Sequence, residues 1–146
     1  MNERSIKYTT FVIERNYSAS PERVFTSWSD LSAKARWYPK ADEFDFRVGG
    51  REINRGNPSG GPIFTFDACY QKIVQNSRIV YTYTLDQGET RISVSLTTAE
   101  IKPVSNGTQL IYTEQGAFLD GHNTPEQREY GTKFMLDKLS EQLENE

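Results

Sequence analysis

The stretch RIVYTYTLDQGETRISVSLT, residues 78–97, contains two strand-like runs joined by a short loop. In each run apolar residues recur at every second position, which is the period of a β-strand. The loop at residues 86–89 contains a glycine and is short enough to join antiparallel neighbours. We therefore predict a β-hairpin. Its expected apolar faces are Ile79, Tyr81, Tyr83 and Leu85 in the first strand and Ile92, Val94 and Leu96 in the second, with Ser93, Ser95 and Thr97 opposite.

Further strand-like runs lie on both sides of this hairpin. Turns at Gly49-Gly50 and Ser105-Asn106-Gly107 separate neighbouring runs. Consecutive strands joined by such short turns pair in antiparallel fashion. The additional predicted strands span residues 8–17, 42–47, 51–55, 63–73 and 108–115.

Helical patterns occur near both ends of the chain. Ser20 is a good cap for a short helix, and Asp30 is a good cap for a second one over residues 31–37. Thr124, followed by proline, predicts the start of a longer helix of about five turns. The expected apolar face of this last helix is Tyr130, Phe134, Leu136, Leu139 and Leu143.

This order of elements predicts an α+β fold. Six to seven antiparallel strands form one sheet, two short helices follow the first strand, and one long helix ends the chain. Because long sheets twist and curl, the last helix is the element available to cover the concave face. The length of 146 residues fits a single domain over residues 1–146.

Composition and charge exclude several classes of partner. The net charge of −3 gives no general attraction to phosphate backbones, so we predict no nucleic-acid partner. No apolar run is long enough to insert into a membrane, and residues 1–10 lack a signal-peptide core, which predicts a cytoplasmic protein. The single cysteine, Cys69, cannot form an internal disulfide and is expected to be a buried inert thiol.

Motifs for metal or cofactor chemistry are missing from the sequence. There is no Cys/His cluster with zinc-ligand spacing and no phosphate-binding glycine loop, and His122 is the only histidine. We therefore expect no metal, no cofactor and no defined catalytic group of residues.

Four segments carry a resemblance to a known family: residues 18–25 (SASPERVF), 36–39 (RWYP), 46–51 (FRVGGR) and 112–118 (YTEQGAF). Together they resemble the SRPBCC (START-like, helix-grip) superfamily, and within it the activator of heat-shock-protein-90 ATPase homologue-like family. The resemblance covers about residues 11–143. The chain departs from that family at Gly131-Thr132, where the family often has Gly-Trp.

A cavity is expected between the sheet and the last helix. A strongly curved sheet and one helix do not pack closely at the centre of the groove, and the resemblance implies the same space. Aromatic side chains are the expected lining, although each could instead fill the core. The candidates are Trp37, Phe44, Phe46, Phe64, Phe66, Tyr70, Tyr81, Tyr83, Phe118, Tyr130 and Phe134.

Four polar residues are candidates for contacts inside this cavity. Arg47, Arg91 and Glu114 lie on or next to predicted strands, where an inward-facing charge needs a partner or a ligand; the alternative is that each faces solvent. His122 precedes the last helix and could lie at the cavity mouth or simply in a solvated loop.

Three functions remain open at this stage. The sequence favours a module that binds a small, lipophilic or aromatic molecule. The resemblance implies two alternatives: a co-chaperone-like partner of the heat-shock-protein-90 ATPase, or a cyclase-, aromatase- or hydrolase-like enzyme that uses the same cavity. The sequence leaves open whether the chain forms a homodimer.

Overall fold

The computed structural model describes residues 5–57 and 60–144, and within them it has one seven-stranded sheet and three helices. This confirms the predicted α+β fold. The strands are β1 (Ile6–Tyr17), β2 (Ala41–Phe44), β3 (Arg51–Gly56), β4 (Phe64–Val74), β5 (Arg78–Gln87), β6 (Thr90–Val104) and β7 (Gly107–Leu119). The helices are α1 (Pro21–Ser29), α2 (Leu31–Lys34) and α3 (Pro125–Glu144).

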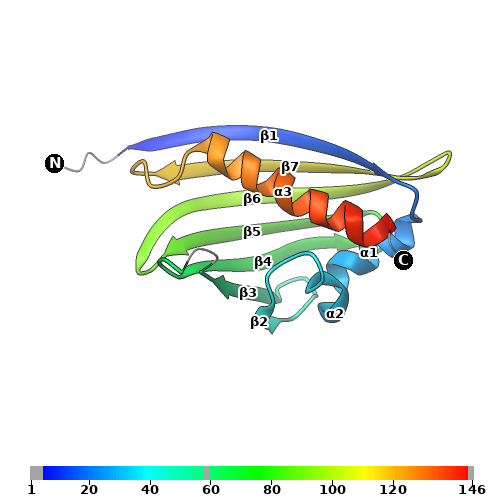
Figure 1. The fold of residues 1–146 in the computed structure, drawn as a ribbon, viewed down its shortest axis with the longest axis horizontal. Coiled ribbons are helices and arrows are strands. Elements are labelled where there is room, and N and C mark those ends of the chain that lie inside the picture. The colour runs from blue at the N-terminus through cyan, green and yellow to red at the C-terminus, as the bar shows by residue number, and fades with distance from the viewer. Residues whose placement is uncertain (1–4, 58–59, 145–146) are drawn as a thin grey trace.

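The sheet is antiparallel throughout, in the order β1-β7-β6-β5-β4-β3-β2. Strands β2 to β7 follow one another as a meander. The first strand, β1, pairs with the last, β7, from Ile6 opposite Leu119 to Tyr17 opposite Thr108. The curved sheet carries α3 diagonally across one face, from a start over β7 to an end beside α1 (Figure 1). The inner face of the sheet and this helix therefore enclose the core.

Local signals explain where the helices begin. The Ser20 side chain accepts a hydrogen bond from the Arg23 backbone N–H at the start of α1, and Asp30 caps α2 in the same way through the Ala33 N–H. The α2 helix is shorter than the predicted 31–37, because the chain leaves helical geometry in a turn before Pro39. Thr124 accepts from the Gln127 N–H and begins α3 as predicted.

The inward face of β6 is its polar face. Ser93, Ser95 and Thr97 are buried, whereas Val94 and Leu96 on the opposite face are 45% and 39% exposed. The register shows why: Ser95 lies opposite Tyr83 and Thr97 opposite Tyr81, so they share the face of the β5 aromatic residues.

A register shift in the β5–β6 pair adds one residue to β6 near Ile92. Leu85 lies opposite Ser93 and Asp86 opposite Arg91, so Ile92 has no opposite residue. Ile92 and Ser93 are consequently both buried.

The predicted inward face of α3 is wrong for its two aromatic residues. Tyr130 is 75% exposed and Phe134 is 54% exposed. With 3.6 residues per turn, residues two apart point to nearly opposite sides, so Phe134 cannot share a face with Leu136. The inward stripe is instead Arg128, Leu136, Leu139 and Leu143.

Candidate functional site

A cavity of about 260 Å³ lies between α3 and the inner face of the sheet. Its wall is mainly aromatic and apolar. Gln127 and Gly131, which are exposed, also border it, so the cavity meets solvent along this side of α3. Its principal lining residues are Trp28, Lys34, Trp37, Tyr38, Phe66, Tyr81, Tyr83, Leu85, Tyr112, Arg128, Thr132, Met135 and Leu136.

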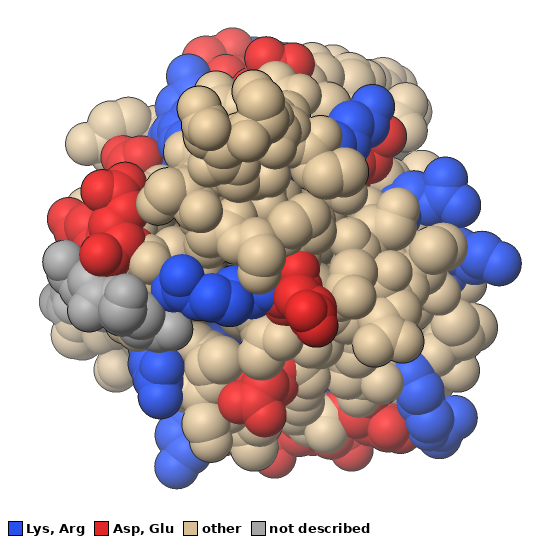
Figure 2. Space-filling view, turned by 90° about the vertical axis from the view of Figure 1, so that its right-hand side faces the viewer, with Lys and Arg blue, Asp and Glu red and all other residues tan. Residues whose placement is uncertain are grey.

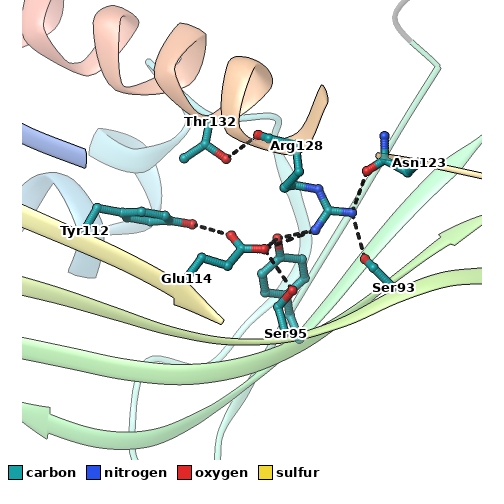
Figure 3. Close-up of polar contacts among 8 residues, drawn as sticks. Ser93, Ser95, Tyr112, Glu114, Asn123, Arg128 and Thr132 are labelled. Atoms are coloured by element: carbon teal, nitrogen blue, oxygen red, sulfur yellow. Dashed lines mark hydrogen bonds and ion pairs between the residues drawn. The ribbon is translucent and has the colours of Figure 1, made fainter. Parts of the chain in front are cut away.

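A buried ion pair joins α3 to the sheet beside this cavity. The Arg128 Nη1 lies 3.2 Å from the Glu114 Oε2, and both side chains are almost completely buried. Arg128 also donates to the Tyr83 hydroxyl at 2.7 Å and to the Ser93 hydroxyl at 2.7 Å. Figure 3 shows the guanidinium of Arg128 pointing from α3 into this group, with Asn123 completing the contacts at 3.0 Å.

The Glu114 carboxylate accepts hydrogen bonds from hydroxyl groups on three strands. Tyr83 and Ser95 donate to Oε2 at 2.7 and 2.8 Å, and Tyr112 donates to Oε1 at 3.2 Å (Figure 3). A buried charge is tolerated only when it is paired and hydrogen-bonded, and Glu114 meets both conditions. This explains why the inward face of β6 carries serines.

Burial keeps the tyrosine hydroxyls of this group in their neutral, donating form. Burial and the neighbouring Glu114 raise the pKa of Tyr83 well above its usual value, although Arg128 opposes the shift. Burial, with Tyr81 and then Glu114, also raises the pKa of Tyr112 well above its usual value. Both hydroxyls therefore remain donors to Glu114 at neutral pH.

A second buried ion pair lies at the α2 end of the cavity. The Lys34 Nζ lies 2.7 Å from the Glu52 Oε1 on β3, and the Tyr70 hydroxyl donates to the same carboxylate oxygen. The ammonium is surrounded by the rings of Trp28, Tyr38 and Phe44, whose centroids lie 5.6, 5.1 and 6.0 Å away. We refer to Lys34, Glu52, Tyr70 and Trp28 as the Lys34 corner.

The structure brings only some of the predicted aromatic residues to the cavity. Trp37, Phe66, Tyr81 and Tyr83 line it. Tyr70 and Phe118 are buried outside the lining, and Phe44, Phe46 and Phe64 are partly buried away from it. Tyr130 and Phe134, on the outer side of α3, do not reach it.

None of the four predicted polar residues is part of the cavity lining. Arg47 and Arg91 are exposed and pair with Asp45 and Asp86, and His122 is exposed in the loop before α3. Each therefore avoids the desolvation cost that burial would impose on a polar or charged group. Glu114 is fully buried and bonds three residues that line the cavity.

Sequence reasoning missed the two cations of the cavity wall, Lys34 and Arg128. Both lie on helices, where a charged residue is normally assigned to the solvent side. A signal for Arg128 existed: it lies eight residues before Leu136 on the same helical stripe. Lys34 gave no such signal. Among the described residues no three His, Cys, Asp or Glu side chains gather as a metal site.

None of the helices in the described ranges is both long and apolar enough to cross a bilayer.

Comparison with known proteins places this fold in a family. Residues 18–144 match the family described as Activator of Hsp90 ATPase homolog 1-like protein. The Mll3558 protein from Rhizobium loti is 44% identical, with a TM-score of 0.90 over 95% of this chain and 99% of that one. An uncharacterized protein from Rhizobium leguminosarum is 42% identical, with a TM-score of 0.92 over 99% of both chains.

A more distant structure shares the fold alone. CalU16 from Micromonospora echinospora is 16% identical, with a TM-score of 0.70 over 97% of this chain and 85% of that one. No curated protein matches the chain significantly. The family match over residues 18–144, together with the 44% identity to the Rhizobium loti protein, shows that the chain belongs to the Activator of Hsp90 ATPase homolog 1-like protein family.

Proposed function

We propose that this protein binds a small, apolar or aromatic molecule in the cavity between α3 and the sheet. The observation that carries the proposal is a space of about 260 Å³ whose wall is mainly aromatic and contains a few polar groups. Ligand sites combine apolar walls with a small number of fixed polar groups in this way. An apolar cavity of roughly 150 Å³ already admits one benzene ring, so this one has room for about two fused rings.

The wall supports binding of a flat molecule. Phe66 and Tyr83 lie with ring centroids 4.6 Å apart, and Trp28 and Trp37 lie 4.9 Å apart in an edge-to-face arrangement. Such packed rings hold their positions without a ligand, so little conformational entropy is lost on binding. The Arg128–Glu114 ion pair likewise fixes the position of α3 beside the cavity before a ligand binds.

Thr132 is the position at which this proposal is best tested. Thr132 lines the cavity from α3, so a larger side chain at this position would enter the space. We expect Thr132→Trp to fill the space with an indole and to weaken binding of naphthalene by about tenfold or more. Equilibrium dialysis of naphthalene against the purified protein measures this directly.

Phe134→Trp is the matched control, because it places the same ring on the exposed side of α3. It should bind naphthalene as the unmodified protein does, and circular dichroism should show that both variants are folded. No naphthalene binding by the unmodified protein, or equal binding by Thr132→Trp, would contradict the proposal.

The family match favours a second candidate, contact with the Hsp90 chaperone. On the face at the α1 end, Lys and Arg are interspersed with Asp and Glu (Figure 2). Such a face offers no concentrated charge of one sign to a chaperone or to a phosphate backbone. Stimulation of Hsp90 ATPase activity by the purified protein would support this candidate, and its absence at micromolar concentration would set it aside.

A further inference from the structure

The two ion pairs beside the cavity differ in how completely their polar atoms are satisfied. Arg128 donates to four acceptors, on Tyr83, Glu114, Ser93 and Asn123. Glu114 accepts from four donors. A polar group that is already saturated has little left to offer a ligand, so this pair serves to hold α3 on the sheet.

Lys34 is far less satisfied. Its ammonium carries three N–H donors, and its one hydrogen bond within the described residues goes to the Glu52 Oε1 at 2.7 Å. The side chain is only 8% exposed, and its ammonium lies near three aromatic rings as well as bordering the cavity. Ring faces attract the positive charge, but they do not replace an oxygen acceptor for the other N–H groups.

Two neighbouring atoms are also buried without a hydrogen bond among the described residues: the Trp28 Nε1 and the Glu52 Oε2. A buried polar atom without a partner destabilises the fold, and native structures contain few of them. Trp28 and Lys34 both line the cavity. The unused N–H donors of Lys34 therefore lie at one end of this space.

We propose that the Lys34 corner binds an oxygen atom of the ligand, and that this oxygen belongs to a neutral hydroxyl or carbonyl group on an aromatic ring system. The inference deepens the proposed function and rests on it. Lys34 supplies the donors, and the aromatic wall holds the rings.

Glu52 sets the preference for a neutral oxygen over an anion. Its carboxylate lies 2.7 Å from the Lys34 Nζ and already neutralises the ammonium. A ligand carboxylate at Lys34 would face the Glu52 charge at close range in a poorly solvated space, where like charges repel strongly. A phenol or ketone oxygen accepts from the ammonium without adding charge.

Three two-ring probes separate these possibilities at neutral pH: naphthalene, the β isomer of naphthol and the β isomer of naphthoate. We expect naphthol to bind about tenfold more tightly than naphthalene, because it adds a hydrogen bond to a charged donor, and naphthoate to bind no better than naphthalene. Equilibrium dialysis gives all three dissociation constants without relying on protein fluorescence.

Lys34→Met should abolish the advantage of naphthol over naphthalene while leaving naphthalene binding in place. Because Lys34→Met leaves Glu52 buried and unpaired, the double variant Lys34→Met/Glu52→Gln is tested beside it; removing both charges of a buried pair is often tolerated. Lys133→Met, on the exposed side of α3, removes one positive charge as a control and should change nothing.

The outcomes distinguish this inference from the proposed function. If naphthalene binds but the hydroxyl adds nothing, if naphthoate binds most tightly, or if the double variant keeps the preference for naphthol, the Lys34 corner is not the anchor. If none of the three probes binds the unmodified protein, the proposed function is wrong and this inference is overturned with it.

Discussion

At the scale of single residues, two buried carboxylates, Glu114 and Glu52, differ in how well their charge is compensated. Glu114 is surrounded by hydroxyl donors and a guanidinium, so its desolvation is compensated by hydrogen bonds and by the opposite charge. Within the part of the chain that the structure describes, Glu52 is bonded through one oxygen only. The same residue type therefore stabilises the structure at one end of the cavity and remains partly unsatisfied at the other.

The Arg128–Glu114 pair gives a prediction about stability. Arg128→Met should lower the free energy of unfolding by about 3 kcal/mol or more, because Glu114 is left buried without its cation. The double variant Glu114→Gln/Arg128→Met should be more stable than Arg128→Met alone, since no uncompensated charge remains. Urea denaturation measures both values.

Arg91→Met provides the reference for this comparison, because its pair with Asp86 is exposed. It should change the free energy of unfolding by less than about 1 kcal/mol. A similar loss in Arg91→Met and Arg128→Met would show that burial of the Arg128–Glu114 pair has no special importance.

At the scale of elements, α3 depends on its inward stripe more than on its own helix propensity. Leu136, Leu139 and Leu143 are buried against the sheet and α1, whereas Gly131 lies inside the helix and is exposed. Glycine weakens a helix because its backbone loses more freedom on folding. A Cβ added at Gly131 would meet open space.

Gly131→Ala is therefore expected to raise the free energy of unfolding by about 0.5–1 kcal/mol. Gly50→Ala is the contrasting variant, because a Cβ there would collide with the Asp45 carbonyl oxygen in the turn before β3. It should lower stability. Thermal unfolding followed by circular dichroism gives the sign of each change, and a loss of stability in Gly131→Ala would contradict this account of α3.

At the scale of the whole molecule, the core is a network of buried tyrosines. Burial raises the pKa of Tyr17 from 10.0 to about 12, and it also raises the pKa values of Tyr38, Tyr70, Tyr81, Tyr83 and Tyr112. These residues come from four strands and the loop after α2. Because the folded protein favours the neutral form of these tyrosines, its stability is expected to decrease at alkaline pH.

We expect stability to be unaffected by these tyrosines below pH 10 and to fall as the pH rises from 10 towards 12. In that interval the unfolded chain has released phenolic protons that the folded protein retains, so raising the pH favours unfolding. Urea denaturation across this range, with tyrosinate absorbance followed in parallel, measures the effect. Tyr17→Phe should show a shallower decline, and an unchanged slope would exclude Tyr17 as a contributor.

Much of the architecture could be predicted from local patterns. Period-two runs and glycine turns identified the strands of the meander, and Thr124 identified the start of α3, because these signals depend on residues a few positions apart. The cavity residues were predicted less well. Tyr81 and Tyr83 were identified, but Lys34 and Arg128 were not, since a charged side chain is assigned to solvent unless its buried partner is known.

The sequence by itself therefore determined the order and the antiparallel pairing of the elements of this protein, and its membership of a helix-grip family. The tertiary structure alone decided which face of β6 turns inward and which cations enter the core. The physical reason is that burial of these polar groups is compensated by residues from other elements: Ser95 by Glu114, Ser93 by Arg128, and Arg128 by Glu114 and Tyr83. The period of a strand or helix shows which residues share a face, but it does not show that distant residues will compensate the burial of polar groups on that face.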